Sequence, residues 1–388
     1  MLKGAIFFYK RYFLKSLHFQ NKFSNFVNQL HMMIEIFTLQ NLPPKDFTES
    51  VAILKQLAKS HRFLAELKGT AKTIPNESIL INTITLQEAK DSSEIENIIT
   101  THDDLYKENI AIDTKKPASK EVFNYAQGLK LGFEIVRNEK LLLNKHVLTI
   151  QKTLLENNAG FRTQAGTKLV NSQGQTVYTP PQSANEVLDL MGNLEKFIND
   201  SDFCDIDPLI KMAIIHYQFE SIHPFYDGNG RTGRIINILY LVLSGLLDIP
   251  ILYLSRYITQ NKAEYYQVLQ DVRTKQDWEH LILYFLKGIE ETANETIDLI
   301  MKIKNLMQDY KTRIKTDLPK VYSQDLINIL FKNPYTKIEF LVNELGINRK
   351  TALVYLDKIE SIGLLKKTKI KNTYFYLNEN LIECLIKG

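Results

Sequence analysis

The 388-residue sequence contains little cysteine and no long uninterrupted apolar run. Its two cysteines, Cys204 and Cys384, exclude a disulfide framework and favour a reducing compartment. The formal net charge of +4 is by itself too small to indicate a nucleic-acid partner. Lys10, Arg11 and Lys15 interrupt the aromatic N-terminal stretch, so we expect neither a signal peptide nor a membrane span there. These absences predict a cytoplasmic protein with no membrane partner.

The chain is long enough for two or three domains, and it has no internal repeat or low-complexity segment. We expect an N-terminal extension at 1–39, a helical region at 40–115, a helical core at 116–317 and a separate domain at 318–388, with Pro319 near the last boundary. The extension is either an amphipathic surface helix or a weakly structured stretch ahead of a natural start at Met32 or Met33.

Most of the chain is predicted to be helical, because apolar residues recur every three or four positions behind small or capping residues. The helical stretches are 46–70, 118–136, 143–156, 183–200, 207–222, 262–273 and 278–315. Residues 162–181 differ, since Gly166 and the turn at 171–174 flank two short alternating stretches that Pro180 and Pro181 end. This pattern predicts a β-hairpin.

The last seventy residues have a pattern of their own. Residues 336–346 and 349–365 predict two helices around a tight turn, and 366–378 predicts two strands around a turn at Lys371 and Asn372. A helix-turn-helix followed by a basic wing is typical of a winged helix. Between 335 and 372 there are eight Lys or Arg and four Asp or Glu, so the excess positive charge of the chain lies in this module.

Residues 221–234, SIHPFYDGNGRTGR, crowd polar and flexible residues ahead of an apolar run. Pro224 is expected to stop the preceding helix, which places His223 at its end. Gly228, Asn229 and Gly230 permit positive φ angles and close backbone approach. Successive N–H groups can therefore converge on the N-terminus of a helix that starts near Arg231, where a phosphate would bind.

The charged residues of this stretch suit the same ligand. Arg231 and Arg234 lie three positions apart, one turn on the same side of the helix, and arginine matches the forked geometry of phosphate. Asp227 can hold Mg²⁺ bound to those phosphates, and His223 can act as a general base. A Gly-Asn-Gly turn or a histidine alone usually has no such role, but in this order none of these residues helps a core. The set predicts phosphoryl or nucleotidyl transfer.

Residues 223–234 match the signature of the Fic family at every specified position, and the resemblance covers roughly residues 40–295. It implies an all-α Fic fold with a small β-hairpin flap, here followed by a C-terminal winged helix-turn-helix domain. It also implies a Mg²⁺-dependent protein adenylyltransferase, which moves AMP from ATP to a Ser, Thr or Tyr hydroxyl of a target protein or of itself and releases pyrophosphate. Family members are further expected to be homodimers.

The resemblance also assigns roles to residues. His223 would deprotonate the target hydroxyl, and Asp227 would hold Mg²⁺. The nucleotide would be held by the loop and the helix after it, at Gly228, Asn229, Gly230, Arg231, Thr232, Gly233 and Arg234. Tyr266 matches an aromatic that packs on adenine, whereas core packing is a plausible role for Tyr265. The hairpin at 162–181 matches the flap that pins a target peptide by main-chain pairing.

A second motif lies in residues 88–98, which otherwise look like the solvated face of a helix. Ser92, Glu96 and Asn97 match the family's inhibitory pattern, Ser/Thr-x-x-x-Glu-Gly/Asn. A Glu96 carboxylate paired with Arg234 would compete with the γ-phosphate of ATP, which predicts low basal activity. In some relatives the same glutamate helps to remove AMP, and that alternative stays open.

Two other classes of function remain open. The winged helix could bind DNA phosphates through Arg349, Lys350 and the wing lysines at 366, 367, 369 and 371. Few of its residues could contact base edges, so a scaffold or dimerisation role is favoured. Alternatively, a Fic enzyme could transfer another group, such as UMP or phosphocholine. An inactive relative is disfavoured, because no catalytic position is degraded.

Overall fold

The computed structural model of the protein describes residues 37–45, 47–101, 105, 116–171, 173–370 and 373–387. Our predictions for the N-terminal extension before residue 37 and for the wing turn at Lys371 and Asn372 lie outside these residues. Residues 40–388 form one unit by their internal contacts, and the description below concerns that unit.

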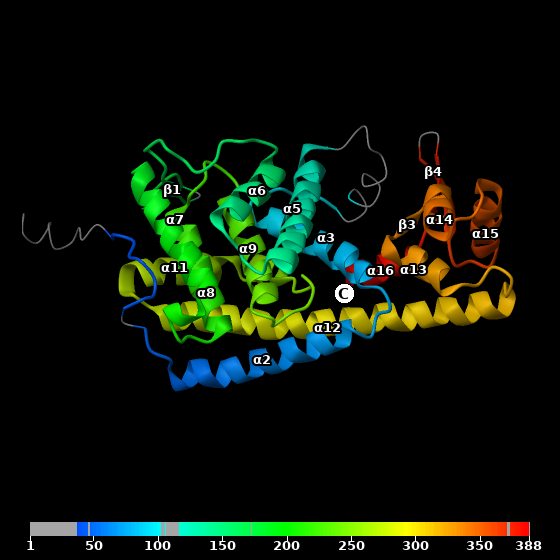
Figure 1. Cartoon of the computed structure of the whole chain (residues 1–388), viewed down its shortest axis with the longest axis horizontal. Helices are drawn as coiled ribbons and strands as arrows, with labels where there is room; N and C mark the ends of the chain where they lie inside the picture. Colours follow the sequence, from blue (N-terminus) through cyan, green and yellow to red (C-terminus); the bar gives the residue numbers. More distant parts are fainter. Residues whose placement is uncertain are drawn as a thin grey trace, which may run out of the picture. The chain divides into compact units, whose positions relative to one another are not determined.

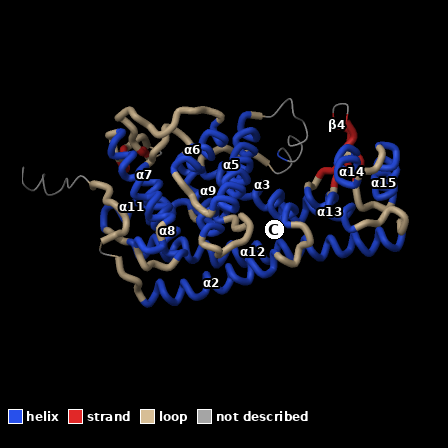
Figure 2. Tube along the Cα trace, viewed as in Figure 1, coloured by secondary structure: helices blue, strands red, loops and turns tan. Residues whose placement is uncertain are grey.

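Helices dominate this unit, as Figures 1 and 2 show. Each predicted helix is present, with ends that differ by a few residues, and α3 and α10 add segments that periodicity did not delimit. The helices before the C-terminal elements are α2 (Val51–Ala71), α3 (Glu77–Ile95), α5 (Pro117–Glu139), α6 (Asn144–Leu155), α7 (Ala184–Asn199), α8 (Pro208–Ile222), α9 (Asn229–Leu243), α10 (Leu254–Gln260), α11 (Lys262–Lys275) and α12 (Trp278–Asp317), with a short 3₁₀ turn at Ser201–Phe203.

The helix pair α8 and α9 lies in the core and carries the loop of interest between its members. Helix α8 starts with Pro208, and the Asp207 side chain caps it by accepting the Leu209 N–H at 2.8 Å. Every residue from Leu209 to Ile222 is buried, so the helix is enclosed on all sides. At Gly233 of α9 a side chain would meet the Glu220 carboxylate at 2.7 Å, which shows how closely the two helices approach. This packing fixes both ends of the loop at 223–228.

The long helix α12 runs alongside α2 (Figure 1) and continues to the C-terminal elements. Ser60 of α2 is buried and donates its hydroxyl hydrogen to the Leu286 carbonyl at 2.7 Å. Gln56 donates to Glu290 across the same contact. Helix α2 is thus packed onto the same helix that leads to the C-terminal elements.

The predicted hairpin is present but short. Strands β1 (Leu169–Val170) and β2 (Thr176–Tyr178) pair antiparallel, with Leu169 opposite Tyr178. Asn171 forms the turn, since its carbonyl accepts the Gly174 N–H at 2.9 Å and its side chain accepts the Gln175 N–H at 2.9 Å. The flap that the resemblance implied therefore exists as an element.

The C-terminal elements have the order expected of a winged helix. They are α13 (Gln324–Lys332), β3 (Tyr335–Thr336), α14 (Ile338–Leu345), α15 (Arg349–Ser361), β4 (Lys366–Ile370), β5 (Thr373–Leu377) and α16 (Glu379–Lys387). The sheet order is β3–β5–β4, and both pairings are antiparallel. Gly346 ends α14 with a φ of 66°, and the Asn348 side chain caps α15. The sequence predicted the two central helices and the strand pair β4–β5, but not α13, β3 or α16.

Helix α3 contacts this C-terminal region directly. The buried side-chain amide of Gln87 donates to the Leu385 carbonyl of α16 at 2.6 Å, and Asn82 donates to the Lys332 carbonyl of α13 at 3.4 Å. The helix that leads to the predicted inhibitory motif is therefore held by α13 and α16 as well as by the core.

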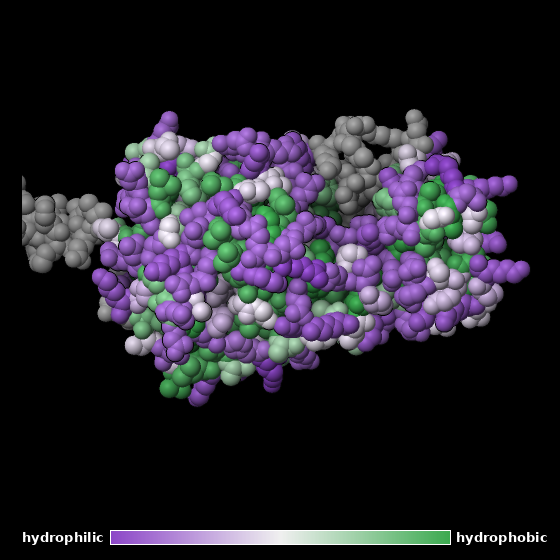
Figure 3. Space-filling view, in the orientation of Figure 1, coloured by the Kyte–Doolittle hydropathy of each residue, from purple (hydrophilic) through white to green (hydrophobic). Residues whose placement is uncertain are grey.

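Hydrophilic residues cover most of the face seen in Figure 3, and apolar residues form small groups between them. Among the described helices, none is both long and apolar enough to cross a membrane.

Candidate active site

The loop between α8 and α9 has a specific backbone shape. His223 ends α8 in the left-handed region, with φ 50° and ψ 57°, and Gly228 precedes α9 with φ 78°. Helix α9 starts at Asn229, two residues before the expected position. The Asn229 side chain holds the loop closed, accepting the Phe225 N–H at 2.8 Å and donating to the Phe225 carbonyl at 2.9 Å. The Asn229 side chain is thus engaged within the loop, and the backbone N–H groups of the first helical turn are further donors that an anion could use.

This loop opens into a pocket of about 290 Å³. The pocket gathers most of the residues that the sequence predicted for the site, together with a few that it did not. Its lining consists of Glu96, Ile98, Glu121, His223, Tyr226, Asp227, Gly228, Asn229, Gly230 and Arg231.

Four predicted nucleotide-binding residues do not line this pocket. Thr232 is fully buried, and Gly233 packs against α8. Arg234 is also buried and is engaged by Glu96. Tyr266 lies half exposed, with its ring 5.1 Å from that of Tyr265. Tyr265 itself is a core residue, because its ring is buried and its hydroxyl bonds to His216 at 2.8 Å.

Arg234 and the predicted inhibitory motif form one cluster. The guanidinium is 2% exposed, and it donates through Nε to Ser92 Oγ at 2.7 Å and through Nη2 to the Ser92 carbonyl and Glu96 Oε1, both at 2.9 Å. Burial raises the pKa of Glu96, but the Arg234 charge outweighs it and holds that pKa below the usual range. Glu96 is therefore a carboxylate at neutral pH.

The Glu96 carboxylate also lies against the first turn of α9. A side chain at Gly230 would collide with Glu96 Oε1, so only glycine permits this approach. The N-terminus of a helix attracts anions through its dipole and its free N–H groups. Glu96 thus lies beside the place where the loop would receive a phosphate.

The end of α3 explains the third motif residue. Asn97 adopts φ 63°, a left-handed conformation that asparagine and glycine tolerate and that commonly ends a helix. Lys262 of α11 donates to the Ile95 carbonyl at 2.6 Å, which places a cation at the negative end of the α3 dipole. These two features fix where α3 stops and thereby where Glu96 lies.

Arg231 has an acidic partner that the sequence analysis missed. Its Nη1 lies 2.6 Å from Glu121 Oε2, and its Nη2 lies 3.7 Å from Asp227 Oδ1. Glu121 belongs to α5, a helix that the sequence analysis connected with no site. Its contact with Arg231 spans 110 positions, so no local pattern could have indicated it.

His223 is in the protonation state that a general base needs. Burial lowers the pKa of its imidazole to about 4, and the charges of Arg162 and Arg273 act in the same direction. The ring is therefore neutral at pH 7 and can accept a proton. The buried Glu220 carboxyl lies one turn earlier on α8, and burial raises its pKa to about 7.

The donor set at the pocket suits a magnesium ion that arrives with a nucleotide. Asp227 is 75% exposed, and its Oδ1 accepts the Gly228 N–H at 2.6 Å. Mg²⁺ is commonly held by one or two carboxylates together with phosphate oxygens and water. Within the described residues no group of three or more His, Cys, Asp or Glu could hold a metal ion by itself. Asp227 therefore fits the predicted role only together with a phosphate ligand.

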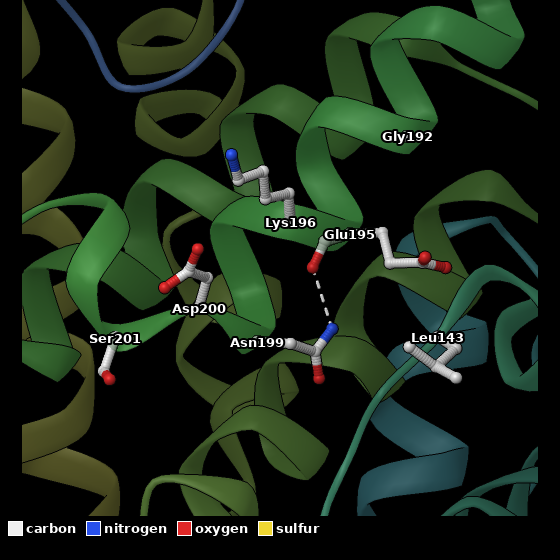
Figure 4. Close-up of a pocket in the computed structure, with 7 residues that line it drawn as sticks. All are labelled: Leu143, Gly192, Glu195, Lys196, Asn199, Asp200 and Ser201. Carbon is white, nitrogen blue, oxygen red and sulfur yellow. Dashed lines mark hydrogen bonds between the residues drawn. The ribbon is translucent and has the colours of Figure 1, made fainter.

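A second cavity, of about 480 Å³, lies beside α7 (Figure 4). It is lined by Leu143, Gly192, Glu195, Lys196, Asn199, Asp200 and Ser201. Asn199 donates to the Glu195 carbonyl at 2.8 Å, the dashed contact in Figure 4, and to the Leu142 carbonyl at 2.9 Å. These contacts hold the end of α7 to the start of α6, and no predicted site residue lines this cavity.

Comparison with known proteins identifies relatives of this chain along much of its length. Three family models match the chain: Fic/DOC family N-terminal at residues 54–134, Fic/DOC family at 141–241, and the C-terminal domain of SoFic-like protein adenylyltransferases at 306–381. The protein adenylyltransferase fic-1 of Caenorhabditis elegans is 32% identical over 119 residues, which cover 30% of this chain and 22% of that protein. A probable protein adenylyltransferase of Aquifex aeolicus is 29% identical over 181 residues, or 45% and 53% of the two chains. The matched region thus spans about half or less of these curated relatives.

Solved structures agree on the fold. A Fic family protein from Desulfovibrio desulfuricans superposes with a TM-score of 0.54 at 21% identity, covering 86% of this chain and 98% of that one. A fragment of Fic-1 from C. elegans gives 0.50 at 21% identity, covering 63% and 72%. At this identity the likeness concerns the fold alone. Together with the family matches and the intact motif at 223–234, it shows that the chain belongs to the Fic/DOC family.

Proposed function

We propose that the protein is an adenylyltransferase that moves AMP from ATP to a Ser, Thr or Tyr hydroxyl of a protein. One observation carries the proposal: a neutral His223, the N-terminus of α9 and the Asp227 carboxylate share one pocket, and Arg231 lies in its wall. A buried general base next to an anion site is the arrangement that transfer of a nucleotidyl group needs. The adenylyltransferase relatives make ATP the favoured donor over other nucleotides or phosphocholine.

The transfer step needs a proton acceptor, a nucleophile and a leaving group. His223 takes the proton of the target hydroxyl while the oxygen attacks the α-phosphorus of ATP. The bond between the α-phosphorus and the bridging oxygen of the β-phosphate breaks, so pyrophosphate leaves and the protein keeps AMP as a phosphodiester. The N–H groups of the first turn of α9 and the Arg231 guanidinium would hold the phosphates. A Mg²⁺ ion held by Asp227 would neutralise phosphate charge.

The remaining contacts of the substrates follow from neighbouring elements. Tyr266 would pack on the adenine, and Arg234 would meet the γ-phosphate. The β1–β2 hairpin would hold the target by strand addition, which uses main-chain hydrogen bonds and demands little of the target sequence. Self-modification follows if a hydroxyl of the same or a second copy reaches the pocket. We also propose that the protein is a cytoplasmic homodimer, with the catalytic core at 116–317 and the winged helix at 318–388.

We infer that Glu96 restrains this activity. Its carboxylate pairs with Arg234 at 2.9 Å, and one guanidinium edge serves Glu96 and a γ-phosphate poorly at the same time. With Glu96 engaged, ATP would bind with its phosphates misaligned for attack. In hydrolytic relatives the same glutamate assists removal of AMP, and this remains an alternative role of Glu96.

Transfer of label from α-labelled ATP to protein, with Mg²⁺ present, tests these proposals together. We expect strong label on Glu96→Gly, weak label on the wild type and none on Glu96→Gly combined with His223→Ala. No label on any variant with ATP, UTP or CTP would refute nucleotidyl transfer. Equal label on the wild type and Glu96→Gly would refute only the restraint by Glu96.

Binding of DNA by the last domain is supported less well than transfer. Arg349 pairs with Glu339, Lys366 with Glu379 at 2.7 Å, and Lys367 with Asp357 at 2.6 Å. These acidic neighbours reduce the charge that the module offers to phosphates. Retention of labelled duplex on nitrocellulose at low salt, lost at moderate salt, would reverse this preference.

A further inference from the structure

The C-terminal end of α8 is capped by an unusual set of donors. The last carbonyls of a helix lack partners within the helix and need donors from elsewhere. Here the Ser221 carbonyl accepts the Tyr178 hydroxyl hydrogen at 2.9 Å, and the Ile222 carbonyl accepts from Arg162 Nη2 at 3.2 Å. The His223 carbonyl accepts from Arg162 Nε at 2.8 Å, and the Pro224 carbonyl accepts the Arg162 backbone N–H at 2.8 Å. Four successive carbonyls around His223 are thus held by Arg162, which precedes the β-hairpin, and by Tyr178, the last residue of β2.

Arg162 has no role in the chemistry described above, yet it is 2% exposed and among the largest fully buried side chains. A buried guanidinium is costly unless its donors are satisfied. The guanidinium donates to main-chain carbonyls, because Nη2 also donates to Pro181 at the far end of the hairpin, and the charge of Glu186 acts on it as well. A cation at this place is favoured by the negative end of the α8 dipole. The position therefore demands arginine, because lysine could not span these carbonyls with one ammonium group.

The loop is also tied back to the hairpin segment from its own side. The Tyr226 hydroxyl oxygen accepts the backbone N–H of Thr163 at 3.0 Å and that of Gln164 at 3.3 Å. The rings of Phe161 and Phe225 pack 5.2 Å apart beside these bonds. The base of the hairpin and the loop that carries His223 are consequently one connected unit.

His223 needs such support because of its backbone conformation. A residue with a side chain at φ 50° is held in a sparsely populated region, which persists only where neighbours fix it. We propose that Arg162 is a positioning residue of the transfer reaction, which fixes His223 against the base of the flap by capping the carbonyls of residues 222–224. The proposal rests on the proposed function, because Arg162 would act only through His223, the proposed general base. Arg162 itself would contact neither substrate.

The charge of Arg162 adds an effect that a neutral cap would not have. The charged and titratable groups around His223 are Arg162, Arg273, Glu220 and Glu96, with Glu121, Tyr226, Asp227 and Arg231 in the pocket wall. Behind the dominant effect of burial, Arg162 and Arg273 lower the pKa of the imidazole and Glu96 raises it. Loss of Arg162 should therefore raise the pKa of His223, whereas Arg162→Lys should leave it low.

The test compares Arg162→Lys and Arg162→Gln in the Glu96→Gly background, using the full chain. Calorimetry gives the affinity for an ATP analogue that cannot be cleaved, and labelling gives kcat and KM. NMR of ¹³C-labelled histidine follows the His223 ring, identified by its loss in His223→Ala. Arg137→Lys is the control, because Arg137 lies in the last turn of α5 with a half-exposed side chain that donates to Glu77 and caps no carbonyl of the loop at 223–228.

We expect both Arg162 variants to bind the analogue within about threefold of the parent and to lose about 10²-fold in kcat, as small misplacements of reacting groups do. The His223 resonance should move in both variants, and its pKa should rise in Arg162→Gln only. An unchanged resonance and an unchanged kcat would overturn the proposal. Loss of kcat together with nucleotide binding and thermal stability would show a merely structural role, and would overturn it as well.

One further variant, Tyr178→Phe, tests the cap separately from the buried charge. Tyr178→Phe removes one cap without a buried charge, and we expect it to fold, to bind nucleotide and to lose about threefold to tenfold in kcat. If the Glu96→Gly parent transfers no AMP, the proposed function fails. The His223 resonance and its pKa still decide whether Arg162 positions the ring.

Discussion

Replacing Glu96 should strengthen ATP binding by an amount that the geometry allows us to estimate. The contact between Glu96 and Arg234 is a charge-assisted hydrogen bond at 2.9 Å, a class that contributes about 1.5–3 kcal/mol. Since the Glu96 side chain is 37% exposed, solvent screens the pair, and we take the lower end, about 1.5 kcal/mol. At that value only about a tenth of the molecules have Arg234 free for a γ-phosphate. Freeing it should increase the affinity for ATP about tenfold.

Two variants separate charge from shape in this prediction. Glu96→Gln keeps an oxygen that accepts from Arg234 but loses the charge, so we expect it to fall between the wild type and Glu96→Gly. Without nucleotide, both variants should melt at lower temperature, because a buried guanidinium then lacks its counter-charge. Added ATP should raise the melting temperature of Glu96→Gly more than that of the wild type.

Calorimetric titration with a non-cleavable ATP analogue, with Mg²⁺ present, measures the affinity in all three proteins. AMP, which has no γ-phosphate, is the matched control and should bind the three proteins alike. Equal affinities for the triphosphate in the wild type and Glu96→Gly would refute competition for Arg234. A tenfold gain for AMP as well would show that Glu96 acts on the pocket in general.

Three other predictions follow from the site. The His223 ring should stay neutral in NMR titrations from pH 8 down to about pH 5, since its pKa is lowered to about 4, and a midpoint near 6.5 would contradict its burial. Burial raises the pKa of Glu88 to about 7. The stability that its protonated form contributes is therefore full below about pH 4.5 and lost as the pH rises through 7, so the wild-type melting temperature should fall more between pH 5 and 8 than that of Glu88→Gln. Asn97→Gly should keep basal transfer low, because glycine adopts the left-handed conformation of Asn97 freely. Valine should destabilise this conformation by about 1–2 kcal/mol, so Asn97→Val should raise basal labelling. Equal labelling of the two variants would exclude strain at the end of α3 as an influence on Glu96.

Local patterns in the sequence were sufficient for most of the fold. The helices from α5 to α12, apart from α10, have apolar residues at helical spacing behind small or capping residues, and each lies near its predicted position. The hairpin was indicated by its turn residues, and the wing by its alternating strands. Helices α13 and α16 were missed because they are short. Ser323 and Asn378 cap their starts, but only packing against α3, α12 and neighbouring elements shows that nine residues continue as a helix after each cap.

The site was predictable where its residues are adjacent in sequence and not where they are far apart. The segment 223–231 is continuous, so its glycines, His223 and Asp227 could be identified together. Thr232 and Gly233 belong to the same segment, but one turn of helix carries them from the pocket into the contact with α8. Helical geometry, not the motif, decides which of these residues can reach a nucleotide.

The residues that set the properties of the site come from distant parts of the chain. Glu121 from α5 pairs with Arg231, and Arg162 from the base of the hairpin caps the loop at His223. Lys262 from α11 holds the end of α3, on which the position of Glu96 depends. Each of these side chains is an ordinary charge in its own stretch of sequence. Packing places each one beside a carbonyl or an opposite charge, so the positions of Glu96, His223 and Arg231 depend on the whole core.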